Sequence, residues 1–206
     1  MPAVTRRAAQ QTMRQRETRA VFGYWDALRG SRLAPLRTEL DPGAIRSCLA
    51  HTFILAVDCA SGHPFRIAGT SICAWFGIEL VRTPFARLFD AASQPALDEA
   101  VRTVTSGIAP FIAQVAGASE RHKTDLEMLL LPLCGSGGQA DRMLGVLTPL
   151  QPAYWLGSHP LRALSMVRTG PDRHGATMAG GWPAAAGSVG LDRPVRPGRF
   201  PQNNHG

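Results

Sequence analysis

The feature that most constrains the fold is the order in which strand-like and helix-like segments follow one another. Two strand-like segments, residues 51–58 and 65–69, are separated by a turn cluster and form a predicted hairpin. Residues 70–106 then show the spacing of short helices. Three further strand-like runs complete the pattern: 110–117, 125–134 and 142–150. This order predicts an α+β fold with a five-stranded antiparallel sheet and short helices on one face.

The stretch 65–77, FRIAGTSICAWFG, changes its period at Gly69. Phe65 and Ile67 alternate with other residues as in a strand, whereas the apolar residues after Gly69 recur every three or four positions. Because glycine reaches positive φ without steric cost, we predict that Gly69 turns the strand into the helix in that conformation. Gly77 marks the predicted end of the helix.

The segments before the hairpin are predicted to form a flexible basic arm (residues 1–14) and an N-terminal helical segment (residues 15–50). Four apolar and aromatic residues fall at positions i, i+3, i+4 and i+7 of one helix: Val21, Tyr24, Trp25 and Leu28. Asp41 followed by Pro42 is typical of an N-cap and a first helical residue.

Residues 51–156 are the predicted core domain, and residues 157–206 are a predicted disordered tail. The tail is rich in Gly, Pro and Arg and contains too little apolar surface to offset the entropy of ordering it. Residues 1–46 contain nine Arg and four acidic residues, and the tail contains six Arg and two. Between them, residues 47–156 contain seven basic and nine acidic residues. The net charge of +7 therefore belongs to the ends, which disfavours nucleic acid as a partner of the core.

The cysteines and the hydropathy pattern indicate the compartment. Cys48, Cys59, Cys73 and Cys134 form no C-x-x-C pair. The first residues lack the apolar core of a secretory signal. No apolar run reaches the roughly 20 residues that a membrane helix needs. These features predict a cytoplasmic protein with reduced thiols and no membrane span.

Four separate segments of the sequence resemble those of a known family. They are YWDALRGSRLAPLRTELDPGAIRSCLAHTFIL, FRIAGTSICAWFGIEL, LEMLLLPL and RMLGVLTPL, in this order between residue 21 and about residue 156. The chain resembles the single-domain PAS-like proteins of alphaproteobacteria, of the PAS_5 or DUF1457 type. The resemblance implies a PAS-like core preceded by an N-terminal helix, a sensory or regulatory role, and a ligand space between the short helices and the sheet.

A pocket in that space is the sharpest site hypothesis, and the alternative is that the same side chains only fill the core. The chain has no N-C-R-F-L word of the flavin type, and residues 94–106 contain no His, so we predict no cofactor; an apolar small ligand stays open. The candidate lining residues are Phe65, Ile67, Cys73, Trp75, Phe76, Phe85, Phe89, Glu127, Met128 and Leu130.

Glu127 is the most interesting polar residue because it lies in an apolar run. It either faces the pocket, where burial would raise its pKa, or pairs with an arginine such as Arg142 on the neighbouring strand. Metal ligation has weak support: Cys59 and His63 are four apart on a turn, and His51 and His122 lie far apart in sequence. We predict no metal site and no catalytic residue.

An interface on the N-terminal helix is a second site hypothesis. Tyr24, Trp25 and Arg29 are residue types that interfaces favour, and the alternative is that they pack on the sheet of the same chain. The predicted function is a non-enzymatic regulatory module that binds protein partners or a second copy of itself. Two other hypotheses remain: an enzyme that uses Glu127 as acid or base, and a protein that associates weakly with nucleic acid through its basic ends.

Overall fold

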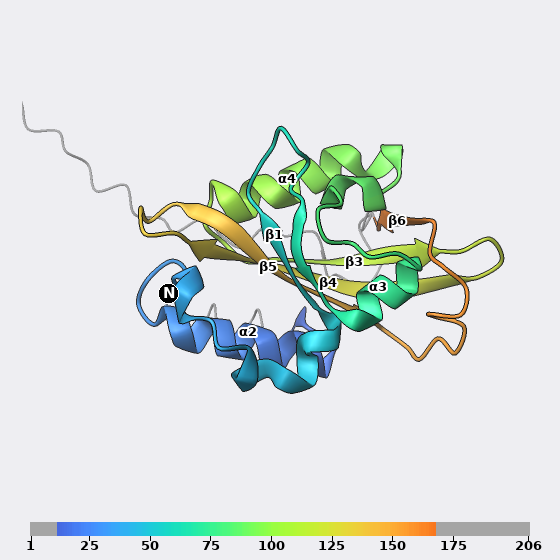
Figure 1. Ribbon diagram of the computed structural model, residues 1–206, viewed down its shortest axis with the longest axis horizontal. Coiled ribbons are helices and arrows are strands. Elements are labelled where there is room, and N and C mark those ends of the chain that lie inside the picture. Colours follow the sequence, from blue (N-terminus) through green and yellow to red (C-terminus); the bar gives the residue numbers. More distant parts are fainter. Residues whose placement is uncertain (1–11, 168–206) are drawn as a thin grey trace, which may run out of the picture.

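The computed structural model describes residues 12–167 of the chain (Figure 1). The helices are α2 (Arg16–Arg29), η1 (Arg37–Glu39), η2 (Pro42–His51), α3 (Thr70–Phe76), η3 (Phe85–Leu88), η4 (Ala91–Ser93) and α4 (Gln94–Thr105), where η denotes a 3-10 helix. The strands are β1 (Thr52–Ala56), β2 (Phe65–Ala68), β3 (Phe111–Ala118), β4 (Lys123–Cys134), β5 (Ala140–Pro149) and β6 (Ala163–Met166).

The strands form one sheet in the order β2-β1-β5-β4-β3-β6, and every neighbouring pair is antiparallel. The predicted α+β class and the antiparallel sheet are therefore confirmed. The hairpin predicted over residues 51–69 is the β1–β2 pair, with Ile54 opposite Ile67. The sheet has six strands within the described residues, whereas the sequence predicted five.

The two faces of the sheet carry different layers, as Figure 1 shows with α4 on one side and α2 on the other. One core, which we call the aromatic core, lies between the sheet and α3, η3 and α4. The other, which we call the α2-side core, lies between the sheet and α2 and η2. The predicted placement of helices on one face is correct for α3, η3 and α4.

The sixth strand corrects the predicted start of the tail at residue 157. Leu164 is fully buried, and β6 pairs with the end of β3. On its other side the Asp90 amide donates to the Leu164 carbonyl, and the Met166 amide donates to the Ser93 hydroxyl. Tertiary contacts hold this four-residue strand in place, so its composition alone does not predict it. Residues 168–206 lie outside the described residues, as do residues 1–11 of the predicted arm.

Gly69 corrects a second prediction. Its φ is −66°, which any residue can adopt, so the predicted positive φ is wrong. The reason for glycine is instead a close approach: a Cβ at residue 69 would lie 2.3 Å from the Ala50 carbonyl oxygen and 2.4 Å from that of Leu49. The end of η2 and the start of α3 therefore touch backbone to backbone. Gly77 ends α3 with φ of 66°, as predicted.

Candidate functional site

The predicted ligand space between the helices and the sheet is filled by aromatic rings. The rings of Phe53, Phe65, Phe85 and Phe89 contact one another with centroid distances of 5.2–5.7 Å. All four side chains are buried. Tilted and edge-on pairs at these distances are typical of a packed core. The remaining large candidates join the same core: Trp75, Phe76, Met128 and Leu130.

Cys73 lies at the margin of the aromatic core and is half-buried. Its thiol donates to the Glu79 carboxylate over 3.6 Å. Burial, together with the nearby Glu79 charge, raises the pKa of the Cys73 thiol, so the sulfur stays protonated and weakly nucleophilic.

Ile67 lies on the opposite face from the one predicted. Residues two apart in a regular strand share a face, which is why Phe65 and Ile67 were assigned to one pocket. The pairing shifts here: Ile54 faces Ile67 but Leu55 faces Phe65, so Arg66 occupies a β-bulge. As a result Phe65 is buried in the aromatic core, whereas Ile67 is 57% exposed beside the α2-side core.

Glu127 is buried on the α2 side and supports the start of α2. Its two carboxylate oxygens accept from the backbone amides of Arg14, at 2.6 Å, and Gln15, at 3.0 Å. Gln15 is the N-cap of α2, where a negative charge complements the helix dipole. The prediction that Glu127 faces the core pocket is wrong, and so is its pairing with Arg142, because Thr148 is its partner on β5.

The three interface candidates belong to α2. Trp25 is buried, and its ring nitrogen donates to the Pro132 carbonyl on β4 at 2.8 Å. Arg29 is buried too and is paired with Asp26. Both side chains are therefore buried within their own chain, and Trp25 contacts the sheet, which was the alternative to an interface.

Tyr24 is half-buried, and its hydroxyl holds the start of η2. The hydroxyl accepts from the Asp41 amide at 2.6 Å and donates to the Asp41 carbonyl at 3.2 Å. Asp41 also accepts from the Gly43 amide as the predicted N-cap of η2. This contact fixes η2 at a set distance from α2.

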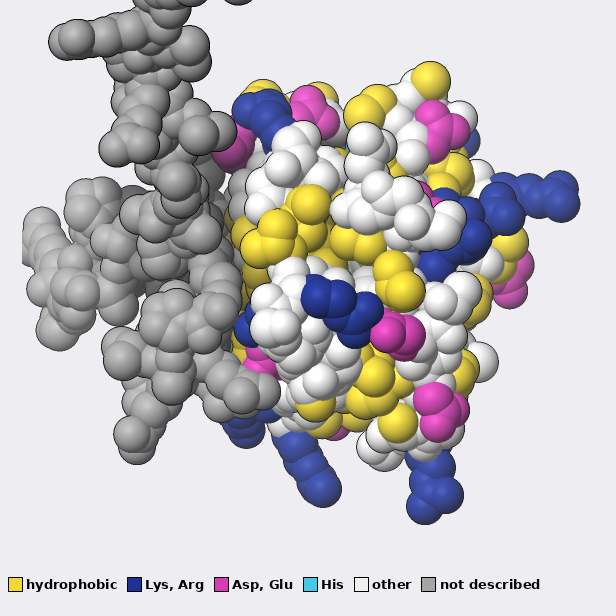
Figure 2. Space-filling view, turned by 90° about the vertical axis from the view of Figure 1, so that its left-hand side faces the viewer, with side chains coloured by type: hydrophobic (Ala, Val, Ile, Leu, Met, Phe, Trp, Pro, Cys, Tyr) yellow, Lys and Arg dark blue, Asp and Glu magenta, His cyan; other side chains and the backbone are white. Residues whose placement is uncertain are grey.

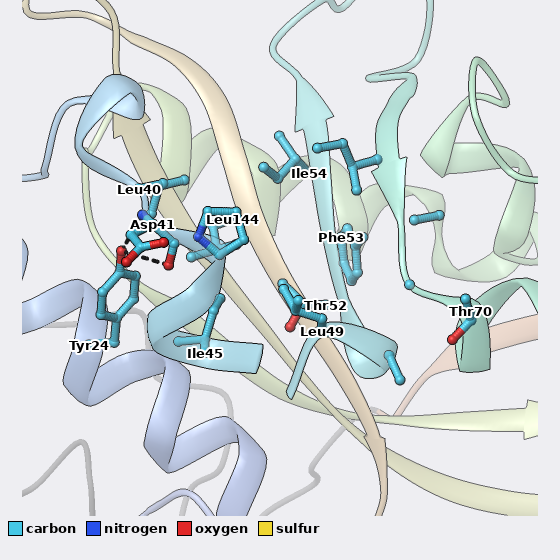
Figure 3. A pocket seen from close by; sticks show the side chains of 15 residues that line it. Tyr24, Leu40, Asp41, Ile45, Leu49, Thr52, Phe53, Ile54, Thr70 and Leu144 are labelled. Carbon is cyan, nitrogen blue, oxygen red and sulfur yellow. Dashed lines mark hydrogen bonds between the residues drawn. The ribbon is translucent and has the colours of Figure 1, made fainter. Parts of the chain in front are cut away.

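A pocket opens on the α2 side of the sheet, beyond η2, and we call it the outer-face pocket (Figure 3). Its volume is about 370 Å³. The walls come from η2, β1, β2 and the first residues of α3, and β5 contributes to the lining. Most of the lining side chains are apolar: Leu40, Ile45, Leu49, Ile54, Ile67 and Leu144.

The outer-face pocket is open to solvent, because two of its apolar walls are exposed. Leu49 is 38% exposed and Ile67 is 57% exposed. Two of the polar lining groups are engaged: the Thr52 hydroxyl donates to the Cys48 carbonyl, and the Asp41 carboxylate accepts from the Gly43 amide. Sequence patterns do not reveal this site, since it depends on where η2 lies over the β1–β2 hairpin. The one relevant signal was the predicted hairpin, which brings the apolar residues Ile54 and Ile67 opposite each other, but it does not show that they line a pocket.

Three of the described histidines contact other rings at two separate places, and His159 is the partner ring of one of them. His51 contacts the Trp75 ring with centroids 5.4 Å apart, and His122 lies between Trp155 and His159 at 5.0 and 5.1 Å. Within residues 12–167 no group of three His, Cys, Asp or Glu side chains is arranged to hold a metal ion.

Positive and negative side chains are mixed on the described surface. Figure 2 shows one end of the molecule, where Lys and Arg side chains are interspersed with Asp and Glu and with apolar groups. No helix in the described part of the chain has the length and apolar character to cross a bilayer.

The antiparallel sheet, with α3, η3 and α4 over one face, defines a PAS fold. The chain belongs to the PAS_5 family, described as a PAS domain, which matches residues 13–148. This confirms the resemblance stated from the sequence. No curated protein matches the chain.

Solved structures with a similar fold include PAS and light-oxygen-voltage domains. A light-oxygen-voltage domain studied with a flavin analogue is 14% identical and has a TM-score of 0.44, covering 54% of this chain and 85% of that chain. The PAS domain of a protein from Colwellia psychrerythraea is 13% identical with a TM-score of 0.40, covering 53% and 97%. A light-oxygen-voltage protein from Rhodobacter sphaeroides is 15% identical with a TM-score of 0.35, covering 56% and 71%.

Proposed function

We propose that this protein is a cytoplasmic, non-enzymatic PAS-type regulatory module that acts by binding another protein at the outer-face pocket. The observation that carries the proposal is the pocket itself, an apolar hollow whose walls include the exposed side chains Leu49 and Ile67. Clustered exposed apolar surface beside a hollow is typical of interaction sites.

The packing of the aromatic core favours a protein partner over a small ligand held between helices and sheet. The rings of Phe53, Phe65 and Phe85 contact one another there. A ligand in that space would have to displace at least one of these buried rings.

The two alternative functions receive less support. Glu127 binds two backbone amides with its carboxylate, which leaves it a structural role instead of acid–base catalysis. The excess positive charge lies in the first 46 and last 50 residues, so a nucleic acid would meet a near-neutral core.

Affinity capture from the native cells tests the proposal with two matched variants. Wild-type protein should retain a partner that mass spectrometry identifies, and Ile67→Glu should lose it because a buried charge would be placed in the contact. Leu33→Glu is the control, since Leu33 is 60% exposed but does not line the pocket. A partner that Ile67→Glu retains as well as wild type would contradict the proposal.

A further inference from the structure

We infer that the turn between β1 and β2, residues 57–64, is an acid-sensitive latch: protonation of His63 loosens the hold of this turn on η3, which lies over the aromatic core. Acid in the range in which histidines titrate is the input to this latch. The inference goes beyond the proposed function, because it depends neither on the outer-face pocket nor on a partner.

The His63 ring takes part in the turn as a hydrogen-bond acceptor. Its Nδ1 atom accepts from the backbone amide of Asp58 at 3.2 Å, and within residues 12–167 this is the one hydrogen bond of that amide. A neutral imidazole has one nitrogen that accepts and one that donates, whereas the protonated ring has two donors. Protonation therefore removes the acceptor and turns an N–H of the ring toward the N–H of Asp58.

The backbone of the turn is strained at the same residue. His63 has φ of 57°, a left-handed conformation in which the Cβ atom lies too close to the following carbonyl oxygen. Two hydrogen bonds between Asp58 and His63 offset this cost: the His63 amide donates to the Asp58 carbonyl at 2.8 Å, and the Asp58 amide donates to the ring. Loss of the second bond leaves the strain with one contact fewer to oppose it.

The turn is attached directly to the start of η3. The His63 carbonyl accepts from the Phe85 amide at 3.3 Å, and the Gly62 carbonyl accepts from the Ala86 amide at 3.5 Å. The Phe85 ring is buried in the aromatic core. An opening of the turn therefore frees the backbone that holds Phe85 over the sheet.

Burial and charge act on the His63 ring in opposite directions. Burial of the half-buried ring lowers the pKa of His63 below its ordinary value. The Ala56 backbone and the charges of Asp58, in the same turn, and Asp98, on α4, favour the protonated ring but do not outweigh burial. Because the pKa is lowered on folding, the stabilisation is complete above the ordinary His pKa of about 6.5 and is lost as pH falls through the lowered value.

NMR on the full-length protein tests the inference without any substitution. The ring signals of His63 should titrate with a midpoint below about 6.5. Protection factors of the Asp58 and Phe85 amides, taken relative to the intrinsic exchange rate at each pH, should fall at least threefold from about pH 7.5 to about pH 5.0. The amide of Leu129, fully buried on β4, reports wider unfolding and should fall less.

Two matched histidine variants assign the pH dependence. Asn tolerates a left-handed φ, and its side-chain oxygen can accept from a backbone amide but does not titrate. His63→Asn should therefore keep the turn and lose most of the fall in protection. His122→Asn is the control, because His122 lies in the β3–β4 turn against Trp155, and it should leave the fall unchanged.

The results separate a latch from a general effect of acid. A His63 midpoint at or above about 6.5, a fall at Phe85 no larger than at Leu129, or an equal fall in His63→Asn and wild type would each overturn the inference. If His63→Asn does not fold, the two wild-type measurements still decide. Loss of a captured partner with Ile67→Glu tests the proposed function separately, so either can fail without the other.

Discussion

The two faces of the sheet are covered to different extents, and this difference explains where the pocket lies. A helix is about 10 Å wide and adjacent strands are about 4.8 Å apart, so one helix covers about two strands. The face with the aromatic core carries α3, η3 and α4. The opposite face carries α2 and η2, which leave the outer part of β1 and β2 open. A shortage of helices, more than any special residue, creates the outer-face pocket.

The largest expected effect tests whether the aromatic core is tightly packed and contains no cavity. Phe85→Ala removes a buried ring that contacts Phe53, Phe65 and Phe89. We expect the free energy of unfolding to fall by about 3–5 kcal/mol in urea titrations. A loss below about 1 kcal/mol would show that this face tolerates a void of ring size, as a ligand cavity does.

The next largest loss of stability is expected at Gly69, where the end of η2 touches the start of α3. Gly69→Ala would push a Cβ against the carbonyl oxygens of Leu49 and Ala50, so we expect the free energy of unfolding to fall by about 1–3 kcal/mol. Gly23→Ala is the matched control, because no atom lies within 4 Å of a Cβ built there in α2. That variant should gain up to about 1 kcal/mol from helix propensity. Equal effects at both glycines would contradict the close approach.

On the α2 side, Glu127→Gln removes the charge that holds the start of α2. One side-chain oxygen remains for two backbone amides, so we expect a loss of about 1–3 kcal/mol in the free energy of unfolding. Hydrogen exchange should accelerate at the amides of Arg14 and Gln15 while β3 stays protected. Glu99→Gln serves as the control, since Glu99 forms an exposed ion pair with Arg102. Unchanged exchange at both amides would refute this role.

The outer-face pocket should contribute little to stability. Ile67 is 57% exposed, so Ile67→Glu should change the free energy of unfolding by less than about 0.5 kcal/mol. Phe65→Ala, two residues earlier on the same strand, should cost about 3–5 kcal/mol because that ring is buried. Similar losses for the two variants would mean that both side chains face one core, contrary to the bulge at Arg66.

The smallest expected effect is a pH dependence at β6. Hydrogen bonds from Ser165 and then Ser93 lower the pKa of Asp90 in the folded chain. This contribution is complete above the ordinary Asp pKa of about 3.9 and is lost as pH falls through and below it. Protection factors of the amides near Leu164, taken relative to the intrinsic exchange rate at each pH, should therefore fall in acid, and Asp90→Asn should remove most of that dependence. A fall of the same size in Asp90→Asn would assign it to other groups.

Local signals in the sequence predicted much of the fold. The β1–β2 hairpin, the N-cap at Asp41 and the end of α3 at Gly77 each depend on residues close in the chain. β6 escaped prediction because its partners are distant in sequence: it pairs with β3, and two residues on its other side, Asp90 and Ser93, lie more than 70 residues away. Four residues of alternating pattern are too few to indicate a strand among Gly, Pro and Arg.

The site residues were harder to predict, for two physical reasons. A single bulge reversed the face of Ile67 relative to Phe65, and the pattern of a strand does not reveal a bulge. The partners of Glu127 are the backbone amides of Arg14 and Gln15. Because every residue except proline has such an amide, the residue types at these positions do not indicate the contact. The aromatic residues were assigned to the correct face, but whether their rings enclose a space or fill it is decided by packing.

The contact at Gly69 has a mechanical consequence. The carbonyls of Leu49 and Ala50 occupy the space where a side chain would be, directly before the first turn of α3. Leu49, Ala50 and Gly69 also line the outer-face pocket. A partner that displaces Leu49 would therefore have to move α3 together with η2, because this backbone contact leaves no space between the two elements.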